Sequence, residues 1–375
     1  MRLITHHPLK LGMFSFRDDR DLDDLLNNLR ANNADLYISL AETTSTEFMS
    51  TLYPQKLVIM GLESSLTLDN RDIEIRLEVF SGGQANLVVE VNVHKNQLER
   101  DALIEFVDEK VRSELCANLL QTKLLISIAE HFKDLRYPKT VSKELDLMYA
   151  YSQILIADSD EEWESMAPIR GMTETARVDC GCLSVDASFI CLRLDDPSKA
   201  SYYCEMLATV TLFTAMAYEL QQQGLQVSRK ILNSNVLVEN DYAELQKYMH
   251  WVDVCEQFQV ELRQEDFLAT SDEQQIARTV ADNWLYSDLC SRVGAVVGSL
   301  ANHVRSIETK RSLRNQDRAN LIFLAFTLIS ILSVSGDLLA LYDIGDKILP
   351  LLRLGIVTAT FAIVSITTVL YLKRR

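Results

Sequence analysis

Four polar side chains that could carry chemistry lie along one apolar run near the end of the chain. The run from 319 to 335 holds no charged residue, yet it contains Asn320, Thr327 and Ser330, and Asp337 follows it. A period of about 3.5 residues places these four residues close to one stripe of a helix. Copies of this helix around an axis would line a narrow passage with amides and hydroxyls, and a ring of carboxylates at its mouth would select cations.

A second interpretation of the same residues stays open. Ser and Thr hydroxyls in a helix often bond their own backbone or join neighbouring helices. For the pore interpretation, Gly336, Asp343 and Asp346 complete the predicted mouth. No residue is assigned to a bound metal.

Two runs have the length and composition of membrane spans. Residues 319–335 and 354–372 each approach the roughly 20 apolar residues that cross a hydrocarbon core. Basic residues stand before the first run and after the second, at Lys310, Arg311, Arg314, Arg318, Lys373, Arg374 and Arg375. The positive-inside rule then predicts a two-helix transmembrane hairpin in the cell membrane, with both termini in the cytoplasm and a short loop, 336–353, outside.

Upstream of the first run, apolar residues recur at helical spacing and predict a long stalk helix. Their positions are Ile276, Val280, Leu285, Leu289, Val293, Val296, Leu300, Val304 and Ile307. No proline interrupts 271–335, so we expect one continuous helix of roughly 100 Å at about 1.5 Å per residue. Few monomers could stabilise such a rod, so we expect several copies of the chain to share it.

The remaining sequence predicts an α/β cytosolic domain over 1–196 and an antiparallel helical layer with the stalk over 197–318, before the hairpin of 319–375. Alternating residues in 73–80 and 87–93, with Gly82-Gly83 between them, indicate a β-hairpin. A helical stripe is predicted at Leu22, Leu25, Leu26 and Leu29. Gly224 is expected to end the first helix of the helical layer.

The composition bears on partners. A formal net charge of -16 disfavours a phosphate backbone, so we expect no nucleic-acid partner. The acidic run 158–164 could bind a cation, although such runs are usually solvated. Cys180 and Cys182 lack the second pair that a zinc site needs. Buried thiols, which suit a cytosolic domain, are predicted at Cys116, Cys204, Cys255 and Cys290.

The sequence contains none of the common catalytic motifs. A Gly-x-Ser-x-Gly elbow, a Walker loop, His-Glu-x-x-His and a dinucleotide fingerprint are all missing. His6 and His7 are expected in a mobile N-terminal segment, which lacks the apolar core of a signal peptide. We therefore expect neither an enzyme nor a cofactor, and membrane insertion would depend on the C-terminal hairpin.

In layout, the whole chain resembles the CorA-like magnesium and metal-ion transporters, and its basic ending, 369–375, is similar to theirs. The family's Gly-Met-Asn motif follows the first span. Here that place holds Gly336-Asp337-Leu338, so only the glycine matches. The family's asparagine ring receives the hydrated ion, and Asp337 could substitute for it as a charged ring with altered selectivity. The resemblance implies a homopentamer that passes divalent cations such as Mg²⁺ through a pore lined by the first span. It also implies cation binding between the cytosolic domains.

Two other functions remain open at this point. The chain could be a two-span membrane effector whose α/β domain binds a small ligand or nucleotide signal, since CorA-like proteins without the motif occur in bacterial defence. It could also be a structural membrane anchor without a pore. The sequence identifies neither the ion nor the controlling ligand.

Overall fold

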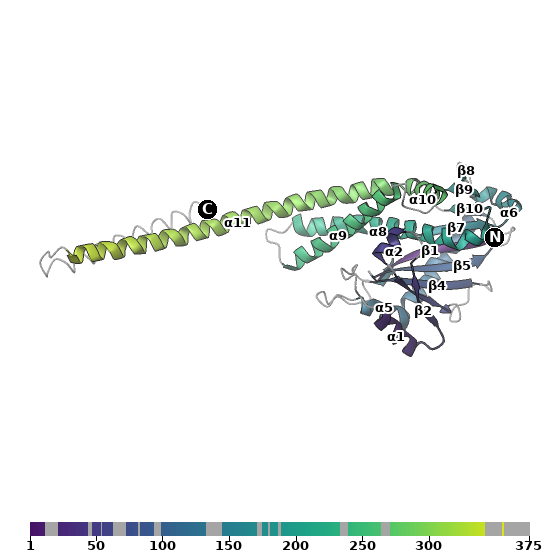
Figure 1. The fold of residues 1–375 in the computed structure, drawn as a ribbon, viewed down its shortest axis with the longest axis horizontal. Coiled ribbons are helices and arrows are strands. Elements are labelled where there is room, and N and C mark those ends of the chain that lie inside the picture. The colour runs from purple at the N-terminus through teal and green to yellow at the C-terminus, as the bar shows by residue number, and fades with distance from the viewer. Residues whose placement is uncertain are drawn as a thin grey trace. The chain divides into compact units, whose positions relative to one another are not determined.

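Among the residues that the structure describes, ten strands pair into one mixed sheet, which organises the unit Met1–Leu300 (Figure 1). The structure, a computed structural model, describes residues 1–11, 22–43, 47–53, 55–62, 73–81, 83–93, 99–132, 145–170, 175–178, 181–186, 189–232, 239–263, 271–341 and 355. The strand order is β2-β3-β4-β5-β1-β7-β10-β9-β8, and β6 also pairs with β1. The strands are β1 (Arg2–Leu11), β2 (Tyr37–Glu42), β3 (Gln55–Met60), β4 (Ile73–Phe80), β5 (Gln84–Asn92), β6 (Leu145–Leu147), β7 (Ser152–Ala157), β8 (Thr175–Val178), β9 (Gly181–Val185) and β10 (Ile190–Leu194).

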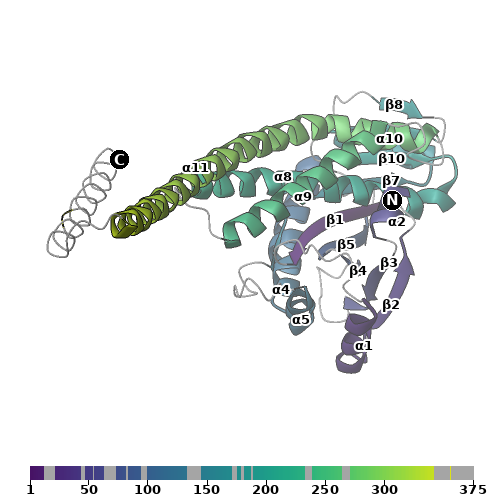
Figure 2. The same cartoon turned by 60° about the vertical axis from the view of Figure 1, so that its left-hand side comes forward.

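Helices cover both faces of this sheet (Figure 2). The helices that precede β6 are α1 (Leu22–Asn32), α2 (Glu47–Leu52), α3 (Arg100–Glu105), the π-helix η3 (Phe106–Cys116), α4 (Ala117–Leu120) and α5 (Lys123–His131). Those that follow it are α6 (Asp160–Ser165), α7 (Ala167–Arg170), the 3₁₀ turn η5 (Pro197–Lys199), α8 (Ala200–Leu232), α9 (Glu239–Arg263), α10 (Ser271–Asn283) and α11 (Tyr286–Leu341). The second unit, Ala301–Arg375, contains the later part of α11.

Strand alternation assigns each side chain to one face of the sheet. Leu3 and Leu9 of β1 point into the main apolar core, together with buried residues of α1, η3 and α5. Lys10 points to the other face, where its ammonium lies 2.5 Å from the carboxylate of Glu219 on α8. The sheet therefore has an apolar side and a more polar side that faces α8.

Several predicted elements are confirmed. The hairpin is formed by β4 and β5, paired antiparallel from Ile73–Val91 to Val79–Ala85. The leucine stripe forms the buried side of α1, since all four of its leucines are buried. The neighbouring strands β2 and β3 also pair antiparallel.

Gly224 does not end a helix, contrary to our expectation, because α8 continues through it to Leu232. A Cβ atom at Gly224 would lie 2.3 Å from the hydroxyl oxygen of Tyr248 on α9. The missing side chain thus allows close contact between α8 and α9. In a sequence, a glycine with this packing role looks the same as a glycine that ends a helix.

The predicted continuous stalk is interrupted between α10 and α11. Leu285 has a φ of 55° and an exposed side chain, although it was placed in the apolar seam. Long-range hydrogen bonds hold the break: the Asn283 amide donates to Val185 O at 3.3 Å, and the Trp284 indole donates to Asp186 O at 3.4 Å. Both partners belong to the end of β9, so tertiary contacts override the local helical pattern.

The predicted membrane hairpin is contradicted. Among the described residues, no helix is both long enough and apolar enough to cross a membrane. The same finding contradicts the predicted multi-pass location in the cell membrane with both termini in the cytoplasm. The run 319–335 lies in α11 and is shorter than the roughly 20 apolar residues that a span needs. Its side chains are described as far as Ser330. Apart from Gly355, the run 354–372 lies outside the described residues.

The domain boundaries at 196 and 318 stay predictions. They separate kinds of element, α/β from helical, whereas the two units of the structure separate at Leu300. The first of the two units includes the sheet, α8, α9, α10 and the start of α11.

We predict that Gly181→Ala lowers the free energy of unfolding by more than about 3 kcal/mol. Gly181 has a φ of 151°, and a Cβ there would lie 1.9 Å from the carbonyl oxygen of Arg193 on β10. Urea unfolding followed by circular dichroism measures the change. The matched control is Gly298→Ala, where a Cβ meets no atom within 4 Å, and it should alter stability by about 1 kcal/mol or less. Equal effects of the two substitutions would contradict this account of β9.

Candidate functional site

The predicted pore-lining residues lie on α11, within the unit Ala301–Arg375. Asn320, Thr327 and Ser330 are exposed. The Thr327 hydroxyl donates to Phe323 O at 2.8 Å, and the Ser330 hydroxyl donates to Phe326 O at 3.0 Å. Both hydroxyls thus bond their own helix, as in the structural interpretation left open above.

The predicted mouth is less completely described. Gly336 and Asp337 belong to α11, but the side chain of Asp337 lies outside what the structure describes. Asp343 and Asp346 lie outside the described residues altogether. The polar stripe therefore stays a prediction.

The same helix exposes large apolar side chains, which we call the α11 apolar segment (Leu321–Phe326). The exposed fractions are 57% for Ile322, 77% for Phe323, 54% for Leu324 and 65% for Phe326. Consecutive residues of a helix project about 100° apart, so these side chains surround the helix instead of forming one stripe. A helix that is apolar all round is normally buried, so this segment calls for a partner surface.

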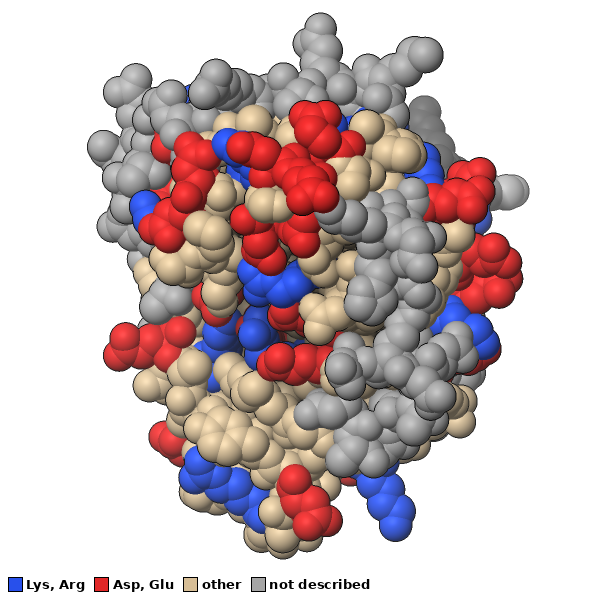
Figure 3. Space-filling view, turned by 90° about the vertical axis from the view of Figure 1, so that its right-hand side faces the viewer, with Lys and Arg blue, Asp and Glu red and all other residues tan. Residues whose placement is uncertain are grey.

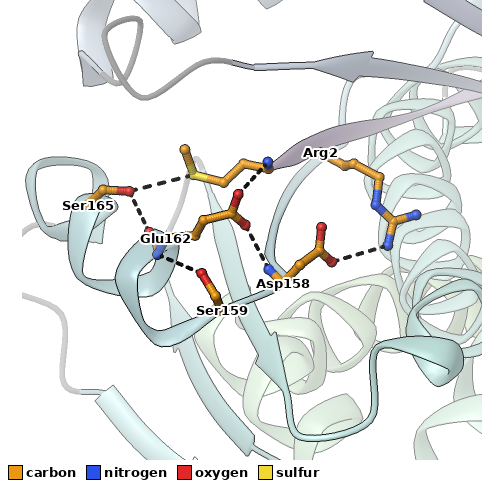
Figure 4. Close-up of polar contacts among 6 residues, drawn as sticks. Arg2, Asp158, Ser159, Glu162 and Ser165 are labelled. Atoms are coloured by element: carbon orange, nitrogen blue, oxygen red, sulfur yellow. Dashed lines mark hydrogen bonds and ion pairs between the residues drawn. The ribbon is translucent and has the colours of Figure 1, made fainter.

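The acidic run 158–164 overlaps α6, and its carboxylates pair with neighbouring basic groups. A Glu162 carboxylate oxygen accepts from the Met1 amine at 3.1 Å, and the other oxygen accepts from the Asp158 backbone N–H at 2.9 Å (Figure 4). Arg2 lies 3.7 Å from Asp158. Arg193 pairs with Asp160 and Asp195. On the face shown in Figure 3, acidic side chains gather around basic ones.

These pairings give the acidic run a structural role. Among the described residues, no group of three His, Cys, Asp or Glu side chains is placed to hold a metal ion. The suggested cation site at 158–164 therefore has no support from the geometry of the described residues.

Charged side chains pair with one another between the sheet and α8, and we call them the α8 charge network (Lys56, Arg76, Glu78 and Glu205). The Lys56 ammonium donates to Glu78 at 3.0 Å and lies 3.5 Å from Glu205 on α8. The Arg76 guanidinium lies 3.1 Å from the same Glu78 carboxylate. Since the side chains of Lys56 and Glu78 are 7% and 4% exposed, the loss of one of them would leave the other buried with one partner fewer.

A small cavity adjoins this network. It is lined by Lys56, Glu78, Glu205, Thr209 and Asn86, and it has room of about 10 Å³ for the centre of a water molecule. The carbonyl oxygen of the Asn86 side chain is buried there, without a hydrogen-bond partner among the described residues. A single buried water fits both the space and the missing donor. The cavity is too small for an organic substrate.

The two neighbouring histidines occupy the centre of the sheet, not a mobile segment as expected. His6 lies in β1, faces α8 and is hydrogen bonded to the Ser152 hydroxyl at 3.1 Å. Burial lowers the pKa of His6 to about 3, with smaller contributions from the charges of Arg76 and Lys56. Burial likewise lowers the pKa of His7 well below its ordinary value, assisted by Arg112 and His6. Both rings are therefore neutral at physiological pH. Alternate residues of 2–11, among them Leu3 and Leu9, are the signal in the sequence for a strand at this place.

The four cysteines that were predicted as buried thiols are confirmed as buried. Burial raises the pKa of Cys116 and of Cys204 to about 12, the pKa of Cys290 to about 11, and the pKa of Cys255 well above its ordinary value. Because the thiolate is the nucleophile, these thiols are unreactive at neutral pH. Of the close pair, Cys182 is half-buried and Cys180 lies outside the described residues.

Comparisons with models of protein families, with curated proteins and with solved structures find no match to this chain. The resemblance in layout described above is therefore neither supported nor refuted by them. The interpretation of function depends on the geometry of this chain.

We predict that Lys56→Met lowers the free energy of unfolding by about 3–5 kcal/mol. The buried Glu78 carboxylate then loses the Lys56 ammonium and keeps only Arg76 as a basic partner. Chemical denaturation measures the loss. The double variant Lys56→Met/Glu78→Leu should recover part of it, since an apolar pair leaves no buried charge. The control Lys110→Met removes an exposed pair with Glu114 and should cost about 0.5 kcal/mol or less. A double variant less stable than Lys56→Met would contradict the role of the network.

The pKa of His6 also predicts a pH dependence of stability. The folded chain keeps this ring neutral down to about pH 3, whereas the unfolded chain binds a proton near pH 6.5, so stability falls as pH falls through this window. Between pH 8 and pH 5 the contribution of His6 is about 2 kcal/mol. We expect His6→Asn to lose less stability than the wild type over this range, as measured by urea unfolding at each pH. Parallel declines for the two proteins would show that His6 is not the source.

Proposed function

We propose that this chain is a homo-oligomeric binding protein whose copies associate through the α11 apolar segment. The observation that carries the proposal is the exposure of Ile322, Phe323 and Leu324, three consecutive large apolar side chains. Full burial of such a side chain is worth about 1.5–3 kcal/mol, so contact with another copy is favoured over contact with water.

The polar stripe is compatible with this association. Asn320, Phe323 and Thr327 are spaced by three and four residues, which is the spacing of the two core positions of a helical bundle. A polar residue at such a position selects register and copy number at some cost in stability. Because Ile322, Leu324 and Phe326 widen the apolar surface beyond these positions, each helix needs more than one neighbour. The proposal therefore favours an assembly larger than a dimer.

Cation passage and catalysis are not part of this proposal. The expected pore requires membrane spans, which are not found among the described residues. Among the described residues, burial keeps the thiols of Cys116, Cys204, Cys255 and Cys290 protonated and the His6 and His7 rings neutral, so none of these groups is an activated nucleophile or base. In this proposal the unit Met1–Leu300 is the ligand-binding part.

We predict that the double variant Phe323→Gln/Phe326→Gln lowers the apparent association constant of the purified full chain at least tenfold. The average mass at a given concentration falls accordingly. Light scattering and sedimentation across a range of concentrations, without detergent, measure this change. Raising the salt concentration should strengthen wild-type association, because salt screens the repulsion between acidic copies and does not weaken apolar contact.

The matched control is Val260→Gln on α9, which removes an exposed apolar side chain, 53% accessible, outside α11. It should leave the mass unchanged. A wild-type monomer at all concentrations would refute the proposal. A chain that stays monomeric alone but binds phosphatidylcholine vesicles through Phe323 and Phe326 would refute it as well, and would assign the segment to lipid.

A further inference from the structure

A larger cavity lies where α9 ends and α11 begins, within the unit Met1–Leu300, and we call it the α9–α11 cavity. Its volume is about 450 Å³, which falls within the range of small-molecule sites. The polar part of its lining is provided by Gln259, Arg263, Arg278, Asp282 and Ser287. The Tyr286 ring adds an aromatic wall, and its hydroxyl is already bonded to Cys255 O at 2.8 Å.

The two guanidinium groups bring more donors to this cavity than the described residues use. The Arg278 Nε donates to Leu262 O at 2.6 Å, and its Nη2 donates to Arg263 O, so this side chain satisfies the carboxyl end of α9. Arg263 donates to the Ser287 hydroxyl at 2.8 Å. Since each guanidinium has five N–H donors, both retain donors for a further acceptor.

The charge of the lining runs against that of the chain. Two arginines and one aspartate give the cavity a formal charge of about +1, in a chain whose net charge is -16. Guanidinium groups match the paired oxygens of phosphates and carboxylates. A cavity of this volume also exceeds what a bare inorganic ion would fill.

We propose that the α9–α11 cavity binds a small organic anion that carries a phosphate or carboxylate group, with Arg263 and Arg278 as its main ligands. This inference goes beyond the self-association proposed above and does not depend on it. The apolar and aromatic wall, from Leu262 to Tyr286, accommodates the organic part of the molecule.

The position of the cavity links its occupancy to the start of α11. The Ser287 hydroxyl accepts hydrogen bonds from both Gln259, at 2.6 Å, and Arg263, at 2.8 Å. An anion competes for these two donors and so changes the contacts of the first turn of α11. The neighbouring Leu285 has a left-handed backbone conformation, which an L residue rarely adopts. A small change in contacts can therefore shift the backbone at the break between α10 and α11. Trp284 reports on the same break.

Titration calorimetry of the full chain with AMP, citrate and inorganic phosphate tests the site. We expect AMP or citrate to bind at least tenfold more tightly than inorganic phosphate, and the stronger of the two identifies the head group. Arg278→Gln and Arg263→Gln should each weaken that binding at least tenfold. Arg278 also donates to backbone carbonyl oxygens at the end of α9, so its loss could affect folding as well as binding. Arg263 donates only to the Ser287 side chain among the described residues, so Arg263→Gln is the variant that separates binding from folding. Tryptophan fluorescence should change on binding in the wild type and not in Trp284→Phe.

The control is Arg292→Gln, which alters an exposed arginine of α11 outside the lining and should leave affinity unchanged. No binding of any of the three probes at millimolar concentration would overturn the proposal. Affinity unchanged in both Arg263→Gln and Arg278→Gln would overturn it too. Binding without a Trp284 signal would refute the link to α11. The variant Phe323→Gln/Phe326→Gln should bind normally, so that a failure of assembly and a failure of binding give different results.

Discussion

The contact between α8 and the polar face of the sheet is the constraint on which the rest of the first unit depends. Lys56 and Glu78 pair on the sheet, Glu205 approaches them from α8, and Lys10 pairs with Glu219 further along the same helix. Because the Lys56 and Glu78 side chains are buried, a displacement of α8 would take Glu205 away from the buried Lys56 ammonium, and these pairs therefore favour one position of α8. The helices α9 and α10 pack on α8, so the cavity at their ends depends on that position in turn.

The distribution of charge explains why a strongly acidic chain provides a place for an anion. Many acidic side chains near α6 are neutralised by Arg2, Arg193 and the Met1 amine. The two arginines of the α9–α11 cavity instead donate to backbone carbonyls and a serine hydroxyl, so their positive charges are not cancelled by the hydrogen bonds that hold them. Net charge thus describes solubility, whereas local pairing decides what each site attracts.

Burial keeps several potentially reactive side chains in their neutral forms, whereas two surface features are open to partners. The buried thiols and histidines are held in their neutral forms by desolvation, and the buried ammonium is engaged by two carboxylates. Two surface features of the described residues instead offer contacts to a partner: the donors of Arg263 and Arg278, and the exposed apolar side chains of Ile322, Phe323, Leu324 and Phe326. Both features suit binding, of an anion in one unit and of further copies of the chain in the other.

The sequence by itself determined the local elements, because their patterns record burial directly: the leucine stripe of α1, the alternation of β4 and β5, and the apolar positions of the buried cysteines. Only the tertiary structure decided the roles of Gly224 and Leu285, since each answers to a partner distant in sequence, Tyr248 in one case and the anchoring of Asn283 and Trp284 to β9 in the other. The same holds for Arg263 and Arg278, which no motif distinguishes. They become a candidate site because helix packing brings the end of α9 beside the start of α11, a proximity that no local pattern encodes.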